Sequence, residues 1–307
     1  MLNIFKKWLN KIKKYVLSDI KRDIDIEKIL LGKILIENLR NKKNIDKLSE
    51  VEFKVFSQFG EDGIIQYLIN NIPLKNKIFI EFGVQDYKES NTRFLLINNN
   101  WNGLLIDSDE KSINYVKNDD IYWKHDIKAV CEFITKENIN SIFISNGFEG
   151  DISLLSIDID GNDYWVWEAI EVVNPRIVIC EYNSVFGCKD AVTIPYEPNF
   201  NRTKAHFSNL YFGASLPALC YLANKKGYIF IGCNNDGNDA FFIRNDFAKF
   251  FKKVTVKEGY VMSNIRDSRN EKGKLTYISG EDRKRKIEAL EVYNIKTDKK
   301  MKIKDLR

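Results

Sequence analysis

The chain has 307 residues, of which 44% are hydrophobic and 30% charged, enough for one large α/β domain with extensions or for two small domains. Its five cysteines form no CxxC pair and there is no secretory signal pattern, so we expect a reducing, cytoplasmic setting. Positive charge is concentrated at the ends, because residues 1–16 contain five lysines and no acid, and residues 281–307 contain ten Lys/Arg against six Asp/Glu. Of the 48 basic and 43 acidic residues, 33 and 37 lie between these ends, and such a mildly acidic body disfavours a nucleic-acid partner.

Residues 1–50 are predicted to form an N-terminal helical extension whose first 16 residues are amphipathic. On a helical wheel their apolar side chains occupy an arc of about 160° and the lysines fill the rest. The helix could lie in an anionic membrane interface, with Phe5 and Trp8 as anchors, which would place the protein at the inner face of the membrane. Alternatively it packs on the body or on a partner protein. The sequence contains no run close to the roughly 20 apolar residues of a membrane span.

From residue 78 the pattern alternates between strand and helix. Residues 78–82 are predicted to be a strand followed by a turn at Gly83, residues 91–97 a helix, and residues 103–106 a strand that ends in Asp107. An acid at a strand end about twenty residues after a glycine turn is the spacing used to hold ribose hydroxyls. Residues 121–123 are predicted to be the third strand, with a helix over residues 127–139.

Asp126 follows that third predicted strand, where an acid could bind a purine amino group or could simply cap the next helix. Further strands are predicted at residues 154–159 and 176–180, and an antiparallel hairpin at residues 228–232 and 240–244. These units predict a Rossmann-like α/β fold with a seven-stranded, mostly parallel sheet whose last strand is antiparallel, and with helices on both faces.

Acids gather where two of these strands end. Asp158 and Asp160 follow one strand, and Glu181 and Asn183 follow the next. If the strands are parallel neighbours, these side chains meet at the carboxyl edge of the sheet, where open α/β folds bind ligands. Oxygen ligands in this number suit Mg²⁺ or Ca²⁺ better than zinc, so the four residues are a candidate magnesium site. Alternatively, a carboxylate there touches the cofactor or acts as a base without a metal.

The segments SQFGEDGII, IEFGVQDYKESNTRFLL, SIDIDGNDYW, ICEYN and YFGASLPAL resemble FkbM-like class I S-adenosylmethionine-dependent methyltransferases over residues 51–247. The resemblance implies that Glu81, Gly83 and Gln85 line the methionine end of the cofactor, with Asp107 at the ribose and Asp126 at the adenine. Gln85 and Tyr87 depart from the glycines of the class consensus.

The acceptor side has fewer candidates. Of the two histidines, His206 lies where this class places acceptor-binding loops and is the candidate base; Asp160 and Glu181 are the other candidate catalytic groups. Tyr211 and Ser215 could contact the acceptor or pack closely. The remaining candidates, Arg266 and Arg269, could bind an anionic acceptor or lie in a solvated loop.

Together these features predict a methyltransferase domain over residues 51–250 and a C-terminal extension over residues 251–307 that could contact the acceptor. The resemblance to FkbM-like enzymes implies O-methylation of a sugar hydroxyl in a bacterial surface polysaccharide or its precursor, with S-adenosyl-L-methionine as the cofactor and with Mg²⁺ as a candidate second one. A methyltransferase on protein or nucleic acid is one alternative, although the motifs of amino-methylating and Pro-Cys enzymes are absent. A non-catalytic or membrane-recruited scaffold is another, but so many adjacent acids at strand ends argue against it.

Overall fold

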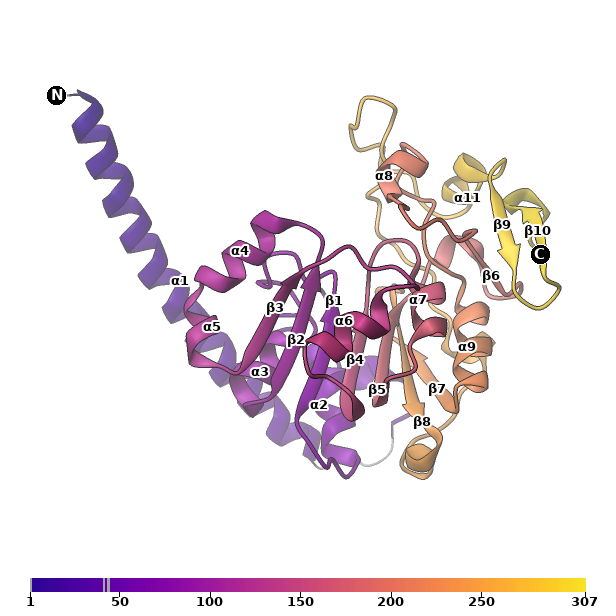
Figure 1. Ribbon diagram of the computed structural model, residues 1–307, viewed down its shortest axis with the longest axis horizontal. Helices are drawn as coiled ribbons and strands as arrows, with labels where there is room; N and C mark the ends of the chain where they lie inside the picture. Colours follow the sequence, from indigo (N-terminus) through magenta and orange to yellow (C-terminus); the bar gives the residue numbers. More distant parts are fainter. Residues whose placement is uncertain (1, 41, 43–44) are drawn as a thin grey trace.

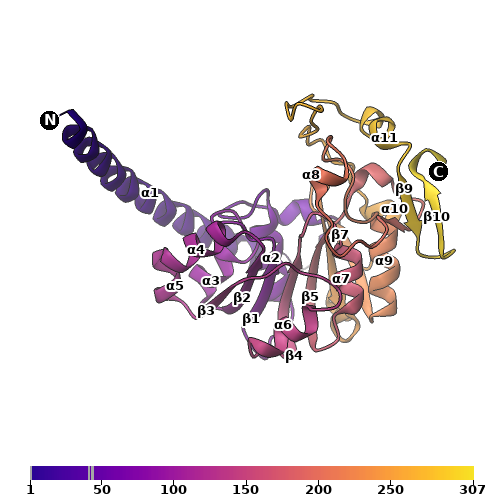
Figure 2. The same ribbon diagram turned by 45° about the horizontal axis from the view of Figure 1, so that its top comes forward.

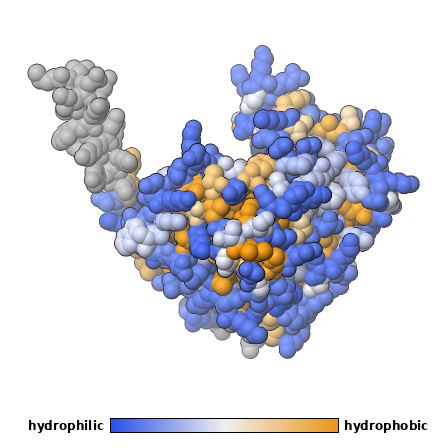
Figure 3. Space-filling model, viewed as in Figure 1, coloured by the Kyte–Doolittle hydropathy of each residue, from blue (hydrophilic) through white to orange (hydrophobic). Residues whose placement is uncertain are grey.

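The computed structural model describes residues 2–40, 42 and 45–307, and for residues 2–16 and Ser18 it describes the backbone alone. A seven-stranded sheet forms the centre of the body, a long helix extends from one side, and a small sheet lies at the C-terminal end (Figure 1). Two further views, one turned and one space-filling, show the same body (Figures 2 and 3).

The strands of the large sheet follow the order β3-β2-β1-β4-β5-β8-β7. Their bounds are β1 (Ile78–Phe82), β2 (Asn102–Asp107), β3 (Ile127–Cys131), β4 (Gly150–Ile157), β5 (Val173–Glu181), β7 (Tyr228–Cys233) and β8 (Asp239–Arg244). Strands β1 to β5 pair in parallel, and β8 lies antiparallel between β5 and β7. The predicted fold class is therefore confirmed. The strand order reverses between β1 and β4, which is where open α/β sheets form a ligand crevice.

Helices cover both faces of this sheet because its central strands are apolar on both sides. In β1, for example, Ile80 and Phe82 join the core on one face and Phe79 joins the core on the other. The first face is covered by α6 (Ile139–Ser145), α7 (Asp163–Ala169) and α9 (Leu216–Lys225). The second is covered by α2 (Glu61–Asn71), α3 (Arg93–Asn99), α4 (Glu110–Asn118) and α5 (Asp120–Lys124).

The third strand lies later in the chain than predicted. Residues 121–123 belong to α5, because the side chain of Asp119 accepts a hydrogen bond from the backbone N–H of Ile121 (3.0 Å) and caps that helix. Strand β3 occupies part of the region predicted as helix, with Lys128 exposed between the buried Ile127 and Ala129. Such alternation is typical of an edge strand.

Helix α1 (Leu2–Arg40) is one continuous helix that leaves the body at an angle (Figures 1 and 2). Its last turns pack on the body through Ile29, Gly32, Ile36 and Leu39. The membrane-interface prediction rests on the side chains of residues 1–16, and these side chains lie outside the part of the chain that the structure describes. Among the described residues, no helix combines the length and apolarity needed to cross a membrane.

The C-terminal residues form a small unit against the body. Its sheet consists of β6 (Val192–Thr193), β9 (Glu291–Asn294) and β10 (Lys299–Lys302), and α11 (Glu281–Ile287) packs beside it. A separate apolar cluster that includes Phe186, Val192, Ile287 and Val292 holds this unit together. The C-terminal extension is thus anchored to the segment that follows β5. The remaining elements of the described residues are the short helices α8 (Arg202–Ala205) and α10 (Val256–Gly259) and the 3₁₀ turns at Leu48–Val51, Ser184–Phe186, Asn245–Phe250 and Ile303–Asp305.

Candidate active site

The turn after β1 adopts a left-handed backbone at three alternate residues. The φ angles are +67° at Gly83, +47° at Gln85 and +58° at Tyr87. A Cβ at Gly83 would overlap the backbone carbonyl oxygen of Asp158, so this glycine lets the β1 and β4 ends approach each other. At the other two positions a side chain is carried in a conformation that costs about 1–2 kcal/mol per residue.

This turn meets the end of β2 through Asp107. One carboxylate oxygen of Asp107 accepts a hydrogen bond from the backbone N–H of Gln85 (2.7 Å), and the other accepts one from the N–H of Asp109 (2.8 Å). Each oxygen keeps a lone pair that can face a ligand. The prediction that Asp107 stands at a ligand site beside the turn therefore agrees with its position, while its role toward a ribose stays a prediction.

A cavity of about 240 Å³ opens between these strand ends. Its lining comes from the ends of β1 to β4 and from one residue of the segment before α8: Gly83, Gln85, Ile106, Asp107, Ser108, Glu132, Phe133, Ile134, Asp158, Ile159, Asp160, Asn162 and Phe200. Gly161 packs directly under the ring of Phe200, so this segment covers the turn after β4. Four successive strand ends thus contribute to one cavity.

Asp126 lies at the opposite edge of the sheet. It precedes β3, its carboxylate accepts a hydrogen bond from the side chain of Asn102 (2.6 Å), and it borders a different hollow. The prediction that Asp126 stands with the cofactor-binding strand ends was wrong, because β3 begins after Asp126 and not before it. The acid at the carboxyl end of β3 is Glu132, which does line the cavity.

Glu81 is buried beneath the cavity, and its carboxylate is hydrogen-bonded to the loop that leads into α3. Its carboxylate accepts hydrogen bonds from the hydroxyl of Ser90 (2.6 Å), the N–H of Asn91 (2.8 Å) and both the N–H and hydroxyl of Thr92. Burial raises its pKa despite these bonds. In this structure Glu81 shapes the loop and is not part of the cavity lining.

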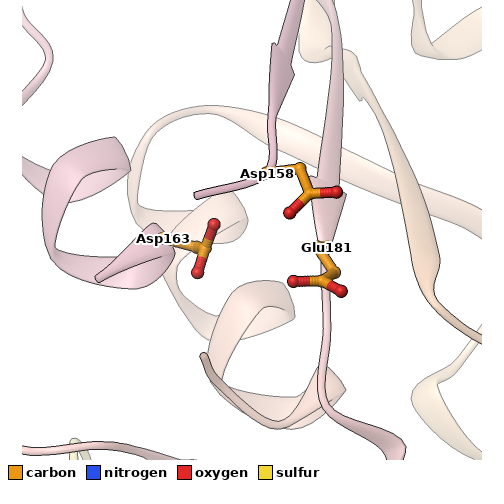
Figure 4. Close-up of side chains that lie close together, drawn as sticks. All are labelled: Asp158, Asp163 and Glu181. Atoms are coloured by element: carbon orange, nitrogen blue, oxygen red, sulfur yellow. The ribbon is translucent and has the colours of Figure 1, made fainter. Parts of the chain in front are cut away.

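Three carboxylates come together beyond β4 and β5. Oxygens of Asp158, Asp163 and Glu181 lie within 4.8 Å of one another (Figure 4). Asp163 begins α7, and its two oxygens accept hydrogen bonds from the N–H groups of Ile159 (2.8 Å) and Gly161 (3.0 Å), which closes the turn. Glu181 is 9% exposed, and its Oε2 has no hydrogen-bond partner among the described residues.

The electrostatics of this group favour a shared proton or a bound cation. Burial, with the charges of Asp160 and Asp163, raises the pKa of Asp158 to about 8. Burial and the charge of Asp158 raise the pKa of Glu181 well above its ordinary value. Two neighbouring buried carboxylates cannot both stay ionised at low cost without a compensating positive charge. Asp158 also lines the cavity, so it connects the cavity to Glu181.

Two of the four predicted metal ligands are engaged elsewhere. Asp160 forms an ion pair with Arg202, although it also lines the cavity. Asn183 is buried, and its amide donates to the carbonyls of Leu210 (2.9 Å) and Phe212 (3.0 Å) while its oxygen accepts from the N–H of Val185 (3.0 Å). The Asn183 oxygen is therefore not directed at the carboxylates, and the predicted four-residue set does not come together: the acids that cluster are Asp158, Asp163 and Glu181.

Arg202 ties the turn after β4 to the C-terminal extension. Besides Asp160, its guanidinium donates to Asp267 (3.1 Å) and to the carbonyl of Asn209 (2.5 Å), and it stacks over the ring of Phe212 at 3.8 Å. The side chain is only 19% exposed. Sequence reasoning did not single out Arg202, because a lone arginine in a polar stretch carries no motif.

The predicted acceptor-side residues lie outside the cavity lining. His206 shares a hydrogen bond with the hydroxyl of Ser208 (2.7 Å), and Tyr211 donates to the carbonyl of Glu291 (2.5 Å). Ser215 is fully buried and caps α9 by accepting from the N–H of Ala218 (3.3 Å), which is the close-packing alternative.

The two tail arginines are held within the C-terminal extension. Arg266 stacks on Tyr277, and Arg269 donates to the carbonyl of Gly273 (2.9 Å). This matches the solvated-loop alternative.

No protein-family model and no curated protein matches the chain. Solved structures similar to it include an S-adenosylmethionine-dependent methyltransferase from Clostridium acetobutylicum ATCC 824, at 9% identity and a TM-score of 0.38, with 60% of this chain and 90% of that chain covered. The N-terminal domain of EvdMO1 with SAH bound aligns at 9% identity and a TM-score of 0.39, covering 61% of this chain and 80% of that one. An O-methyltransferase from Bacillus cereus in complex with SAH aligns at 10% identity and a TM-score of 0.35, covering 72% and 89%.

Proposed function

We propose that the chain is an S-adenosylmethionine-dependent O-methyltransferase that acts on a sugar hydroxyl of a surface polysaccharide or its precursor. The observation that carries the proposal is the cavity in which the left-handed turn after β1, Asp107 after β2 and Asp158 after β4 meet. In the resemblance drawn from the sequence, the first two positions hold the methionine end and the ribose, and Asp158 is the acid predicted to touch the cofactor or to bind a metal.

The cofactor would lie along the strand ends. Gly83 and Gln85 would face its methionine end and Asp107 its ribose, while Glu132 and Phe133 flank the position left for the adenine. When bound, S-adenosylmethionine supplies an electrophilic methyl group. Methyl transfer is a displacement at carbon, so the protein's part is to align the acceptor oxygen and to remove its proton.

Asp158 and Glu181 are the residues placed to remove that proton. Asp158 lines the cavity with a Glu181 oxygen within 4.8 Å, and burial raises the pKa of Asp158, which makes it a stronger base once it is ionised. The unpartnered Glu181 Oε2 and the clustered oxygens also fit a divalent cation. In that case Asp158 and Glu181 would hold Mg²⁺, which would lower the pKa of the acceptor hydroxyl.

The test is methyl transfer from radiolabelled S-adenosylmethionine to nucleotide-linked and lipid-linked sugar acceptors, with Mg²⁺ or with a chelator. Transfer to a hydroxyl that falls at least about tenfold in Glu181→Gln would support the proposal. Dependence on Mg²⁺ would decide between the cation and the unaided base. Labelling of protein or nucleic acid in preference to every sugar would contradict the proposed acceptor.

A further inference from the structure

Helix α1 carries an apolar face that the body leaves uncovered. Its members are all exposed: Leu17 (64%), Ile20 (50%), Ile24 (45%), Leu30 (55%), Leu31 (61%), Ile34 (61%) and Leu35 (39%). The N-terminal part of the helix projects beyond the body, and its last turns run along the body (Figures 1 and 2). A soluble helix normally buries a face of this size.

The spacing of these residues is that of a coiled coil. Leu17, Ile24 and Leu31 recur every seven residues and take the a positions of a heptad, while Ile20 and Ile34 take d positions. Glu27 occupies the d position between them. The described residues of α1 that are buried or half-buried are Asp25, Ile29, Gly32, Ile36 and Leu39. All five fall at b and f positions, on the outer side of such a coil.

We propose that α1 pairs with α1 of a second copy of this chain in a parallel, two-stranded coiled coil. Because the body packs on the b and f positions, two bodies would lie on opposite outer sides of the coil and leave the a and d positions free to pair.

Charge favours the parallel direction. In a parallel pair each g residue meets the e residue of the next heptad on the other helix. Asp23 of one copy then meets Lys28 of the other, and Leu30 meets Leu35, so one contact is between opposite charges and the other is apolar. In an antiparallel pair e residues meet e residues, and Lys28 would face another lysine at Lys21 or Lys28.

The residues of this face also favour a coil of two helices over larger coils, and they disfavour insertion of α1 into a membrane surface. Leucine at two of three a positions, with isoleucine at two of three d positions, favours three or four strands, but these would bury more of the charged e and g residues Lys21, Asp23 and Lys28 than a pair does. Asn38 at the next a position is typical of a pair in fixed register. Asp23 and Glu27 lie within the apolar face, where they would oppose insertion into an anionic lipid surface.

The first test is the mass of the full chain in solution by sedimentation equilibrium. We expect a dimer, and we expect Leu31→Lys to give a monomer with an unchanged circular dichroism signal from the body. Ile26→Lys is the matched control, because Ile26 is 49% exposed at an outer c position; this variant should stay dimeric. Glu27→Leu should tighten the dimer at least about tenfold by adding apolar contact at the d position.

Cross-linking tests the direction. Leu17→Cys and Leu31→Cys, each oxidised beside the unsubstituted chain to account for the exposed Cys131, should both give a covalent dimer, since only a parallel pair in register brings both positions together. A chain that is monomeric at every concentration would overturn the proposal, leaving the face to a lipid or to another protein. So would a dimer that survives Leu31→Lys, or one that cross-links at neither position.

Discussion

At the scale of single residues, the turn after β1 retains a left-handed backbone at positions where glycine would be easiest. Gln85 is exposed and makes its one described hydrogen bond through its backbone N–H, whereas Tyr87 is buried and bonds to Thr92 (2.9 Å). Strain of this kind persists where the surrounding structure holds it, and it is common at ligand sites.

Replacing Gln85 measures that strain. We expect Gln85→Gly to be more stable than Gln85→Ala by about 1 kcal/mol in the free energy of unfolding, because glycine adopts positive φ without a Cβ clash. Chemical denaturation gives the difference. At Glu89, an exposed neighbour whose φ is not positive, the order should invert, with the glycine variant the weaker one. An alanine variant as stable as the glycine variant at position 85 would show that the backbone there is unstrained.

Asp158 should make stability depend on pH. Its pKa is raised to about 8 in the folded protein, so the stability it contributes is complete below the ordinary value of 3.8 and is lost as pH rises through 8. Without divalent cations, Asp158→Asn should therefore be more stable than the parent by on the order of a few kcal/mol at pH 9 and about equal to it at pH 4.

Denaturation curves across this pH range measure the effect. The matched control is Glu137→Gln: the hydroxyl of Tyr196 lowers the pKa of this exposed carboxyl, so its removal should give no gain in stability at pH 9. A parent chain whose stability relative to Asp158→Asn does not change with pH would mean that Asp158 titrates normally.

At the scale of elements, the sequence predicted most strands and the edge of the sheet at which the acids gather. Long apolar runs with a turn at each end identified β1, β2, β4 and β5, and the hairpin of β7 and β8 followed from its short polar turn. Strand β3 was misplaced because residues 121–123 have β-favouring side chains, while the capping by Asp119 and the packing of Ile121 hold them in α5. Side-chain partners such as those of Asn183 depend on loops that local patterns do not place.

Because β3 lies later in the chain than predicted, Glu132 and Asp126 stand at opposite ends of the strand, and we expect only Glu132 to affect cofactor binding. Glu132→Ala should weaken S-adenosylmethionine binding by about tenfold, because Glu132 lines the cavity and a hydrogen bond to a charged group contributes roughly 1.5 kcal/mol or more. Asp126→Ala, at the far edge of the same strand, should leave the affinity unchanged. Equilibrium binding of both variants decides the matter, and the reverse order of effects would restore the original assignment to Asp126.

At the scale of the whole molecule, Arg202 joins the turn after β4 to the C-terminal extension. It links Asp160 at the cavity with Asp267, which follows α10 in the chain. The C-terminal extension is therefore connected to the cavity lining by the ion pairs of Arg202, even though Arg266 and Arg269 do not line the cavity.

Removing the bridge should loosen the extension. We expect Arg202→Met to lower the free energy of unfolding by about 2 kcal/mol, because three hydrogen bonds of a largely buried guanidinium are lost. Limited proteolysis should then cut within residues 251–307 sooner. The control Arg285→Met, whose ion pair with Asp282 is 74% and 65% exposed, should change stability by less than about 0.5 kcal/mol. Equal losses of stability in Arg202→Met and Arg285→Met would mean that Arg202 does not hold the C-terminal extension in place.

The most direct test of the proposed function is calorimetric titration of S-adenosylmethionine into the full chain, with Mg²⁺ and with a chelator. Binding of one molecule per chain, weakened by Asp107→Ala and by Glu132→Ala, is the predicted result. No heat of binding under either condition, together with no change in thermal stability at saturating S-adenosylmethionine, would contradict the methyltransferase proposal and favour a non-catalytic scaffold.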